Sequence, residues 1–530
     1  MRLWEIIENA AAAEADQLAL VAEGRRWTFA ELQRDVVGLG SGLAGLISPG
    51  DRVVIVADNR ASYVAALYAV PRAGGVLTFG NTRHTAPELA ELLARSGATV
   101  LMGSADQLER LAALTPPTVR HRVCLDGVTT GAIPVADLLA TRPSPATTAA
   151  GAVGAAGAAG HPVPDDAMAW LLYTSGTTGR AKGAMLTHRS IVAAVLNTTM
   201  ARPVADDDVY LFPFPLFHIA AYNVVHHHLR RRPVVLLPRF DPVEVMAAIE
   251  AERVTSVSLA PTMLAMLLDH PDRAGSDLSP LRQISYGAAA MPLDLLRRAL
   301  VELPGVGLAQ GYGMTELSGN AVFLSPDDHR RAATTDPDLL TAAGRPAPLA
   351  ALRIVGDEGT EVAPGDTGEI IVRGDQVCAG YLDDPDANAA AITDGWLHTG
   401  DVGLIDARGY LHVVDRKKDI IITGGENVSS REVEDALGTH PGVAAVAVVG
   451  VPHEVWGEQV VALVVPPSGA AAPTLADLRG WAPDLAGFKH PRAVLVVDEL
   501  PANASGKVDK VALRAHAAAE LGREVPPHDT

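Results

Sequence analysis

The chain has 530 residues, of which 48% are apolar and 20% are charged, and its formal net charge is −19 at pH 7. This length exceeds what one hydrophobic core usually supports, so we expect more than one domain. The acidic balance argues against nucleic acid or an anionic membrane surface as a partner, because both are held by clustered Lys and Arg.

The N-terminal residues 1–16, MRLWEIIENAAAAEAD, predict an amphipathic helix carrying Glu5 and Glu8, not a signal peptide. No apolar run is long enough to span a membrane. The only two cysteines, Cys124 and Cys378, are too few for a disulfide framework, which favours a reducing compartment. We therefore expect a cytoplasmic protein without membrane insertion.

The first part of the chain alternates between helical and strand-like patterns. Residues 28–46 and 61–72 predict helices, and the run DRVVIVA at 51–57 predicts a buried strand. Such alternation is typical of a parallel sheet with crossover helices. Residues 40–45 match the dinucleotide-binding pattern G-x-G-x-x-G, but they lie in a helical run, so we interpret them as packing and turn glycines. Residues 142–164 are rich in Ala, Gly, Pro and Thr and predict a flexible surface connection.

A loop rich in glycine and hydroxyl side chains follows the apolar strand predicted at 168–173. Its sequence, YTSGTTGRAKGAMLTH at 173–188, combines three glycines that let a ligand approach the backbone with several hydroxyl donors and the cation Lys182. These residue types predict a cradle for a polyphosphate. The loop is not a Walker A motif, because Ala181 stands where that motif has Gly, and Gly183 where it has Ser or Thr.

Beyond residue 349 the pattern changes to short strands with tight turns, such as PGD at 364–366 and ARG at 407–409. We predict a β-rich subdomain over 349–414. From Asp415 onwards, at the charged cluster DRKKD, the sequence predicts a compact α+β unit over 415–530.

The loop at 173–188 resembles the signature loop of the adenylate-forming superfamily, which includes acyl-CoA synthetases, aryl-CoA ligases, peptide-synthetase adenylation domains and luciferases. Further segments resemble its other motifs in family order: QGYGMTE at 310–316, TGD at 399–401, DRKKD at 415–419, GGEN at 424–427 and SGKVDK at 505–510. The resemblance, closest to acyl-CoA synthetases, implies an α/β fold. A large N-terminal domain of layered α/β, 1–414, would bind ATP and the acid, and a small mobile α+β lid domain, 415–530, would cap them.

The resemblance implies a reaction in two halves that uses ATP, Mg²⁺ and CoA. A carboxylate is a poor electrophile, because its charge repels nucleophiles and it lacks a leaving group. Attack on the α-phosphate of ATP, with release of pyrophosphate, converts it into an acyl-adenylate with AMP as leaving group. Cations and a metal must neutralise the charge that gathers in this step. The acyl group then passes to the thiol of CoA.

By the same resemblance, Lys507 would bridge the acid and the phosphate during adenylation, and Thr315 would touch the α-phosphate. Glu316 and Thr178 would hold Mg²⁺, and Tyr312 would stack on adenine. The residues implied to bind ATP or AMP are Thr174, Ser175, Gly176, Thr177, Thr178, Gly179, Lys182, Gly287, Ala288, Gln310, Gly311, Tyr312, Asp401 and Arg416.

Asp415 matches the aspartate about which the C-terminal domain turns in this family. One orientation would deliver Lys507, and the other would present Gly424 and Gly425 beside a tunnel for pantetheine. Arg239 matches a basic position that contacts CoA in related ligases.

The acid pocket is assigned to Ala220, Tyr222, Tyr286 and Gly313, with His218 lining the acyl path. Amino-acid-activating members carry an Asp where this chain has His218, and hydroxycinnamate ligases carry a Tyr where it has Ala220. A buried polar substrate group would lack a partner there, whereas buried methylenes gain free energy. We therefore predict an apolar acid, a fatty or other alkyl chain ahead of an aryl acid and well ahead of an α-amino acid.

The consecutive His226, His227 and His228 suggest a metal site at first sight. Neighbouring residues of a helix point about 100° apart, so one ion cannot easily collect all three. We interpret them as local structure.

Three alternatives stay open. An enzyme of the same superfamily can load an acyl carrier protein, although this chain has no carrier domain of its own. Another nucleophile, such as an amine or a small inorganic anion, can take the acyl group instead. A non-catalytic nucleotide-binding regulator would keep the loop but lose the metal glutamate or the C-terminal lysine, whereas Glu316 and Lys507 are both present.

Overall fold

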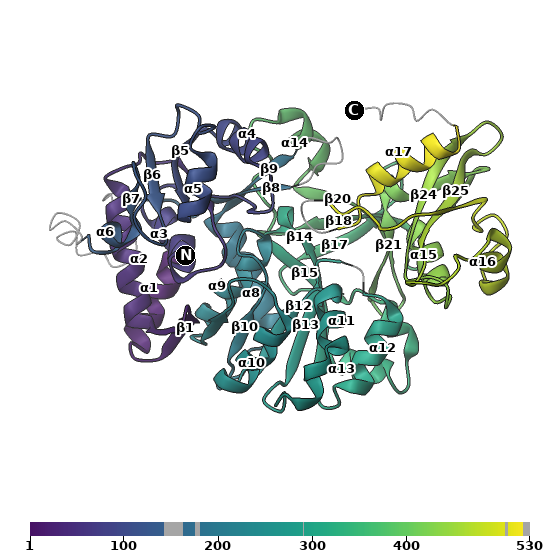
Figure 1. Cartoon of the computed structure of the whole chain (residues 1–530), viewed down its shortest axis with the longest axis horizontal. Coiled ribbons are helices and arrows are strands. Elements are labelled where there is room, and N and C mark those ends of the chain that lie inside the picture. Colours follow the sequence, from purple (N-terminus) through teal and green to yellow (C-terminus); the bar gives the residue numbers. More distant parts are fainter. Residues whose placement is uncertain (142–162, 175–180, 290, 504–506, 523–530) are drawn as a thin grey trace. The chain divides into compact units, whose positions relative to one another are not determined.

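The computed structural model describes residues 1–141, 163–174, 181–289, 291–503 and 507–522. Most of the connection predicted at 142–164 lies outside these residues, and so do the loop residues 175–179. The described chain divides into two compact units (Figure 1). The first spans Met1 to Ala351 and takes in Val372–Leu397, and the second comprises Leu352–Ile371 and the chain from His398 onwards.

Seven strands of the first unit form a sheet in the order β7-β6-β5-β3-β4-β8-β9. All neighbouring strands are parallel except the hairpin β8–β9, which confirms the predicted parallel sheet. The strands are β3 (Arg52–Val56), β4 (Val76–Phe79), β5 (Ala98–Gly103), β6 (His121–Cys124), β7 (Ile133–Pro134), β8 (Met168–Thr174) and β9 (Lys182–Thr187).

A second sheet of the same unit has nine strands in the order β16-β15-β14-β13-β12-β10-β11-β1-β2. Its strands from β14 to β1 are parallel, so their carboxyl ends share one edge. The strands are β1 (Leu18–Ala22), β2 (Arg25–Thr28), β10 (Tyr210–Phe212), β11 (Val234–Leu236), β12 (Ser256–Leu259), β13 (Gln283–Gly287), β14 (Gly307–Met314), β15 (Gly319–Leu324) and β16 (Arg345–Pro346).

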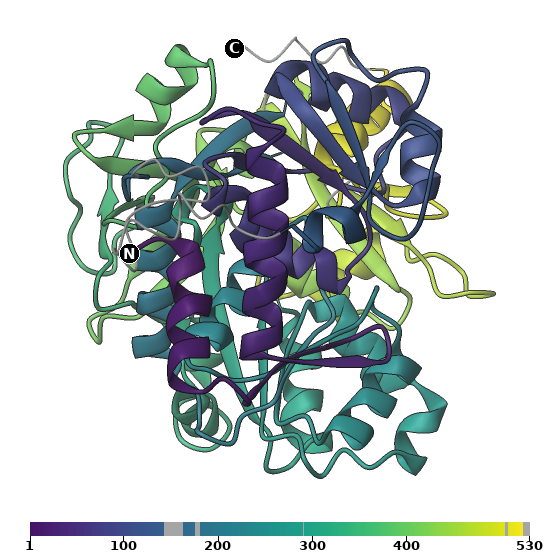
Figure 2. The same ribbon diagram turned by 90° about the vertical axis from the view of Figure 1, so that its left-hand side faces the viewer.

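Helices pack against both faces of each of these sheets. The largest apolar core joins side chains from both sheets with α1 (Leu3–Ala13), α2 (Phe29–Ala44), α3 (Ala61–Arg72), α8 (His188–Ala201) and α9 (Tyr222–Leu229). Figure 2 shows α1 and α2 lying side by side as the two purple helices. A second core lies under α10 (Pro242–Glu252), α11 (Pro261–Asp269) and α12 (Leu293–Glu302). A third lies under α4 (Ala86–Ser96) and α5 (Ala105–Leu111). The unit also contains α6 (Val135–Leu139), α13 (Pro326–Ala332) and α14 (Pro385–Ala391).

The sequence explains where α2 begins and how it packs. Thr28 and Glu31 form a capping box, in which the hydroxyl of Thr28 accepts from the N–H of Glu31 and the carboxylate of Glu31 accepts from the N–H of Thr28. A side chain at Gly40 would bring its Cβ to 3.2 Å from the carbonyl oxygen of Ala69 in α3. This position is a packing glycine inside a helix, as the sequence context predicted.

Five strands within residues 351–416 form a third sheet, in the part of the chain for which a β-rich subdomain was predicted. Its order is β17-β18-β20-β19, with β21 paired to β20. The strands are β17 (Ala351–Val355), β18 (Gly368–Arg373), β19 (Ile392–Thr393), β20 (Trp396–Ile405) and β21 (Leu411–Arg416).

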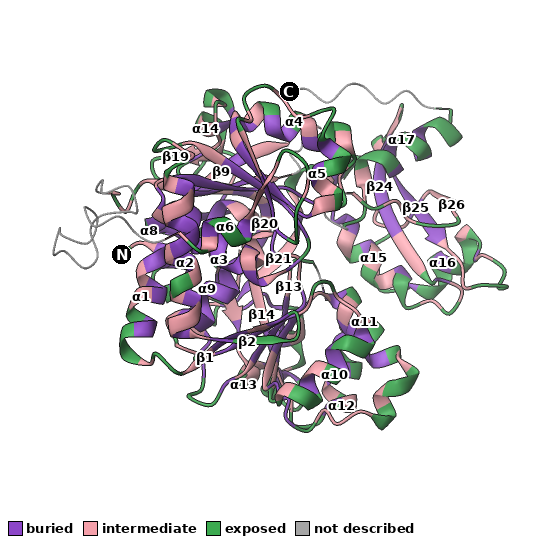
Figure 3. Cartoon of the chain, turned by 60° about the vertical axis from the view of Figure 1, so that its left-hand side comes forward, coloured by how far each residue is buried: buried purple, intermediate pink, exposed green. Residues whose placement is uncertain are grey.

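The C-terminal part has the predicted α+β character. Its sheet has the order β23-β22-β25-β24, with β26 paired to β25, and helices pack on both faces. The central strands β24 and β25 are mostly buried, and the outer helix faces are exposed (Figure 3). The elements are β22 (Ile421–Thr423), β23 (Glu426–Val428), α15 (Ser430–Gly438), β24 (Ala445–His453), β25 (Gly457–Val465), α16 (Leu475–Trp481), β26 (Ala493–Val496) and α17 (Lys510–Glu520). Throughout the described chain, no helix combines the length and apolar character needed to cross a membrane.

Candidate active site

In the first unit, the carboxyl ends of β13 and β14 bring two predicted motifs together. Gly287 and Gly311 are register partners in these parallel strands. A side chain at Gly287 would place its Cβ 2.6 Å from the carbonyl oxygen of Gly311, so only glycine fits there. Ala288 follows with a positive φ of 67°, which turns the chain away from the sheet edge. The segments assigned to adenine, Gly287–Ala288 and Gln310–Tyr312, are therefore adjacent.

Glu316 lies directly after β14, in the short 3₁₀ helix η3 (Thr315–Leu317), and its side chain is buried. Its Oε1 accepts hydrogen bonds from the hydroxyls of Tyr381 (3.0 Å) and Thr174 (3.3 Å). The hydroxyl of Thr174 also lies 3.4 Å from the carbonyl oxygen of Lys182, and its single proton can serve only one of these acceptors. Within the described residues, no donor contacts Oε2 of Glu316. A carboxylate oxygen is the kind of ligand Mg²⁺ prefers, so this position fits the metal role assigned to Glu316.

The two ends of the glycine-rich loop lie at the same site. Thr174 at the end of β8 is the register partner of Lys182 at the start of β9. The ammonium of Lys182 lies 5.3 Å from the ring centroid of Tyr381. Ser175, Gly176, Thr177, Thr178 and Gly179, which were assigned to the phosphates and to Mg²⁺, lie outside the described residues.

Tyr381 is a site residue that the sequence did not reveal. It follows β18 in a loop that belongs to no motif, and the chain brings it to Glu316 across 65 positions. Burial, reinforced by the charge of Glu316, raises the pKa of the Tyr381 phenol. The hydroxyl therefore stays protonated and donates a hydrogen bond to the carboxylate of Glu316.

Cys378 supports the same region through its backbone and not through its thiol. Its N–H donates to the carbonyl oxygen of Glu316 over 2.8 Å. Burial raises the pKa of the Cys378 thiol to about 12, so the thiol stays protonated and is no nucleophile at neutral pH.

The residues assigned to the acid fall into two groups. Ala220 lies in the short helix η1 (Ile219–Ala221) and is half-buried, with His218 immediately before that helix. Tyr222 and Gly313 both lie close to Gly319. A Cβ placed at Gly319 would lie 2.9 Å from the ring of Tyr222, and a Cβ placed at Gly313 would lie 2.1 Å from the carbonyl oxygen of Gly319. These residues therefore adjoin one another around the start of α9 and β15.

Tyr286 is not brought to this group. Its side chain packs in the core beneath α10–α12, on the face of β13 opposite to Ser285 and Gly287. Its hydroxyl donates to Nε2 of His329 over 2.7 Å, because Nδ1 of His329 donates to the carbonyl of Ser325 (2.8 Å). Burial lowers the pKa of His329, which keeps the imidazole neutral.

Tyr222 has its hydroxyl in the protein interior, 3.4 Å from Oγ1 of Thr198. Arg239, assigned to CoA, is exposed in the loop between β11 and α10.

The three consecutive histidines each have a separate partner: His226 contacts Arg202, His227 contacts Asp208, and His228 contacts Tyr68. Among the described residues no cluster of His, Cys, Asp and Glu is arranged to hold a metal ion.

In the second unit, Asp401 and Arg416 are register partners in β20 and β21. Nε of Arg416 lies 2.7 Å from Oδ1 of the buried Asp401. The N–H of Asp401 donates to the hydroxyl of Thr399 (3.1 Å), so the TGD motif fixes the backbone around this carboxylate.

Asp415 is buried beside them and connects β21 to α15. Its Oδ2 accepts from the hydroxyls of Ser430 (2.7 Å) and Ser429 (3.2 Å) and from the N–H of Arg431 (3.3 Å). Its Oδ1 accepts from the N–H of Arg416 (2.7 Å). Such a set of donors stabilises a buried carboxylate and ties the two elements together.

The remaining predicted residues of this unit are exposed. Gly424 and Gly425 form the turn between β22 and β23. Lys507 precedes α17, and its N–H donates to Oδ1 of Asn503 over 3.1 Å.

Two family models match most of the sequence. The model described as AMP-binding enzyme matches residues 7–382, and that described as AMP-binding enzyme C-terminal domain matches residues 432–507. The chain belongs to the AMP-binding enzyme family. The predicted adenylate-forming superfamily and its α/β fold, with a large N-terminal and a small C-terminal domain, are thereby confirmed.

Relatives in this family cover nearly the whole chain. A feruloyl-CoA synthase of an Amycolatopsis species is 39% identical over 93% of this chain and 94% of its own. A 3-[(3aS,4S,7aS)-7a-methyl-1,5-dioxo-octahydro-1H-inden-4-yl]propanoyl:CoA ligase of Mycobacterium tuberculosis is 39% identical over 94% of this chain and 96% of its own. A fatty acid–[acyl-carrier-protein] ligase of Streptomyces coeruleorubidus is 34% identical over 96% of this chain and 95% of its own.

Among solved structures, the amide bond synthetase McbA of Marinactinospora thermotolerans superposes with a TM-score of 0.84. It is 32% identical, and the alignment covers 97% of this chain and 99% of that one. The predicted enzyme class, an AMP-forming acid–thiol ligase that uses ATP, Mg²⁺ and CoA, agrees with the family and with these CoA ligase relatives.

Proposed function

We propose that this enzyme is an acyl-CoA synthetase that activates a predominantly apolar carboxylic acid. The observation that carries the proposal is the buried carboxylate of Glu316, held by Thr174 and Tyr381 where β8, β9 and η3 meet. The segment that carries Glu316 also contains Gly311, which lies against Gly287. A carboxylate, a lysine and permissive glycines at the ends of strands are the parts that a polyphosphate with a metal ion requires.

In the first half-reaction the carboxylate of the acid attacks the α-phosphate of ATP, and pyrophosphate leaves. Lys182 supplies positive charge beside the loop that would hold the phosphates. Glu316 would hold Mg²⁺ through its Oε2, and the metal supplies charge neutralisation at the phosphates. Lys507 would bridge the acid and the α-phosphate, and Asp401 beside Arg416 would accept the ribose hydroxyls.

The second half-reaction places the thiol of CoA at the acyl-adenylate, and AMP leaves. For this step we propose that residues 415–530 turn as one domain relative to residues 1–414 about Asp415. Gly424 and Gly425, with their exposed turn, would then line the pantetheine path, and Arg239 would contact CoA. The bonds from Ser429, Ser430 and Arg431 to Asp415 support a rigid connection on the C-terminal side of the hinge.

The acid is proposed to be apolar along most of its length. Ala220 offers no hydrogen bond from its side chain, and the hydroxyl of Tyr222 faces Thr198 in the interior. No carboxylate stands at His218 to pair with an ammonium group. One relative is named for a fatty acid, which supports this choice, whereas two others are named for a feruloyl acid, which is phenolic, and for a dioxo-octahydro-indenyl propanoic acid.

The thiol of CoA is the proposed acceptor, and two other acceptors are represented among the similar proteins. The Streptomyces relative is named for an acyl carrier protein and McbA for an amide bond. An enzyme that uses ATP and CoA, with two buried free cysteines, fits the cytoplasm.

ATP–pyrophosphate exchange over a panel of acids tests this proposal, followed by detection of CoA thioesters. We expect exchange with medium-chain alkyl acids and thioester formation when CoA is added. Highest exchange with an α-amino or phenolic acid would overturn the choice of acid. Exchange without thioester would favour a carrier protein or an amine as acceptor, and no exchange with any acid would favour a regulator that only binds nucleotide.

A further inference from the structure

The two faces of β12 and β13 differ in chemical character. Four residues on one face are apolar and belong to the core beneath α10–α12: Val257, Leu259, Ile284 and Tyr286. The alternate residues of the same strands are polar: Ser256, Ser258, Gln283 and Ser285. These polar residues are paired in register, Ser256 with Gln283 and Ser258 with Ser285. We call this set of four residues the serine track.

The serine track leads away from the candidate active site. Gly287 lies on the same face as Ser285 and Gln283, because alternate residues of a strand point the same way. From Gly287 to Gln283 the strand covers four residues, a length of roughly 13 Å. One end of the track therefore lies at the adenine segments, and the other at the amino end of β13.

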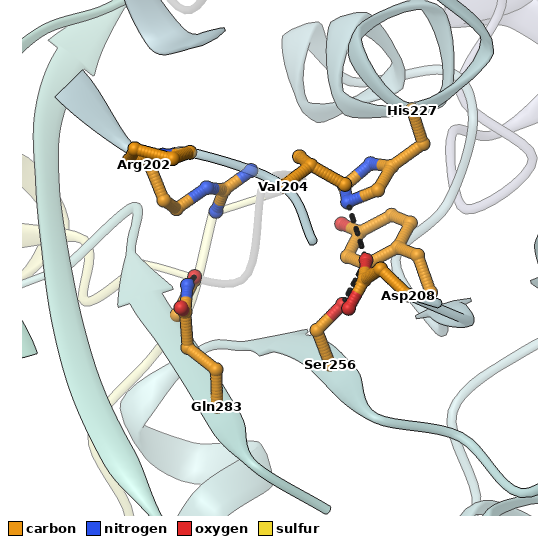
Figure 4. A pocket seen from close by; sticks show the side chains of 9 residues that line it. Arg202, Val204, Asp208, His227, Ser256 and Gln283 are labelled. Atoms are coloured by element: carbon orange, nitrogen blue, oxygen red, sulfur yellow. Dashed lines mark hydrogen bonds and ion pairs between the residues drawn. The ribbon is translucent and has the colours of Figure 1, made fainter. Parts of the chain in front are cut away.

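A small polar cavity lies at that far end. Its volume is about 20 Å³, which is room for one oxygen-bearing group or a single water. Figure 4 shows Arg202 and Gln283 on one side of it and Asp208, Ser256 and His227 on the other. The lining residues are Arg202, Pro203, Val204, Asp208, Tyr210, His227, Ser256, Gln283 and Ser285.

The carboxylate of Asp208 is already provided with donors. It accepts from the hydroxyls of Thr255 (2.6 Å) and Ser256 (2.9 Å), and Nε2 of His227 lies 3.5 Å from it. Burial alone would raise the pKa of Asp208, but these contacts outweigh it and hold the pKa at about 2. The ring of His227 stacks on Tyr210 with centroids 3.7 Å apart, which fixes this side of the cavity.

Arg202 on the opposite side has donors to spare. The residue is only 9% exposed, and Nη2 donates to Oδ1 of Asn223 (2.9 Å) and contacts Nδ1 of His226 (3.2 Å). Within the described parts of the chain, its Nε and Nη1 have no hydrogen-bond partner, and no carboxylate pairs with its charge. A largely buried guanidinium gains from each further acceptor that its nitrogens can reach, so the cavity favours an oxygen atom that can accept from Nε or Nη1.

One side chain joins this arginine to the acid pocket. The amide nitrogen of Asn223 donates to the carbonyl oxygen of Ala220 over 3.1 Å, while its amide oxygen accepts from Arg202. Ala220 belongs to the proposed acid pocket, so Arg202 is one residue removed from it. The serine track and Asn223 thus connect residues of the site with the lining of the same cavity.

We propose that the acid ends in an oxygen acceptor, a carbonyl or a second carboxylate, which lies in this cavity and accepts hydrogen bonds from Arg202 and Gln283. The inference rests on the proposed function and refines it. The body of the acid is apolar, and its far end is polar. Carboxyl group and distal oxygen would lie on the order of 10 Å apart, comparable with the length of β13 from Gly287 to Gln283.

Matched substrates test the proposal through pyrophosphate exchange. Each alkyl acid is compared with the acid of equal length that ends in a methyl ketone and with the corresponding dicarboxylic acid. We expect an oxygen-terminated acid to have the higher kcat/KM in the wild-type enzyme. In Arg202→Met this preference should fall at least about tenfold, the effect of losing a charged hydrogen bond. Arg189→Met removes an exposed arginine of α8 that pairs with Asp165, and should keep the preference.

A second variant keeps the test independent of the folding of Arg202→Met. Ser285→Val fills the middle of the serine track with methyl groups. The chain length that gives the fastest pyrophosphate exchange should therefore shift towards shorter acids, without loss of exchange itself. Unchanged chain-length dependence in this variant would contradict the proposed path.

Other outcomes separate this inference from the proposed function. Exchange with alkyl acids and no preference for an oxygen-terminated partner would overturn the inference and leave acid activation standing. Formate that raises the melting temperature of the wild type, but not of Arg202→Met, without any acid preference would show that the cavity binds a free anion. In that case the acid assignment fails. A loss of exchange with every acid would instead contradict the proposed function itself.

Discussion

The hydroxyl of Tyr381 lies 3.0 Å from Oε1 of Glu316 and donates to it. Because the phenol keeps its proton, this bond fixes one carboxylate oxygen and leaves the other directed elsewhere. A glutamate that must hold a metal ion gains from such an arrangement, since its rotamer is set before the ion arrives. Tyr381 is therefore a positioning residue for Glu316.

Replacing Tyr381 with Phe should slow adenylation about 10- to 100-fold, the effect of removing a hydrogen bond to a charged group. The apparent Mg²⁺ affinity should weaken with it. Pyrophosphate exchange measured against Mg²⁺ concentration checks both effects. Tyr63→Phe is the control, because the buried hydroxyl of Tyr63 has no hydrogen-bond partner among the residues that the structure describes. Equal rates for the two variants would contradict the role of Tyr381.

Glu316→Gln keeps the shape of the side chain and removes its charge. We expect Mg²⁺-dependent adenylation to fall by orders of magnitude, because the metal would lose an anionic ligand. Exchange rates and Mg²⁺ titrations of the purified variant measure this. A wild-type dependence on Mg²⁺ would remove Glu316 from the metal site.

Lys507→Ala should separate the two half-reactions. Adenylate formation should be lost, whereas attack of CoA on a supplied acyl-adenylate should continue, because the lysine serves only the first orientation. Single-turnover assays with synthetic adenylate measure the second step. Lys489→Ala, which removes a half-buried lysine paired with Glu432, is the control and should affect neither step. Equal loss of both steps in Lys507→Ala would argue against domain alternation.

Asp415→Pro should interrupt the reaction cycle, because proline fixes φ and removes a backbone donor at the proposed hinge. We expect one half-reaction to survive and the other to be blocked. Ser430→Ala is the matched variant, since it removes the 2.7 Å bond to Asp415 but leaves φ free. Its main effect should be on stability, with both half-reactions retained. Full turnover by Asp415→Pro would place the hinge elsewhere.

Asp208 makes the stability of the first unit depend on pH in the acid range. Its pKa is about 2 in the folded protein, against 3.8 for the ordinary group. A depressed pKa contributes stability that is fully present above pH 4 and is lost as the pH falls towards 2. Asp208→Asn should lower the free energy of unfolding by on the order of 2 kcal/mol at neutral pH. It should also flatten the dependence of stability on pH between about 2 and 4. Melting temperatures between pH 2 and 6 test it, with the exposed Asp206→Asn as control.

Local patterns were sufficient to predict several elements. The helical pattern at 28–46 predicts α2, which the structure places at Phe29–Ala44. The apolar run at 168–173 predicts β8, which the structure places at Met168–Thr174. In both cases, neighbours in the sequence carry the signal.

The sequence could not predict contacts made by residues outside any motif. Tyr381 reaches Glu316 only because the chain returns from β18 to the end of β8, and no periodicity encodes that return. Tyr286 was expected beside the acid, yet strand alternation turns its side chain to the opposite face of β13, where it meets His329. Arg202 gave no signal at all, because its significance depends on which acceptors its guanidinium meets in space.

The donors around Asp415 also decide where this chain could be cut and rejoined. Ser429, Ser430 and Arg431 hold its carboxylate, and the hydroxyl of Ser429 also donates to the carbonyl oxygen of Val414 over 3.0 Å. A chimera that exchanges C-terminal domains between relatives would keep this cluster intact with a junction before Val414. A junction after Arg416 would instead combine an aspartate from one parent with the serines of another, and its success would depend on whether both parents carry the same donors.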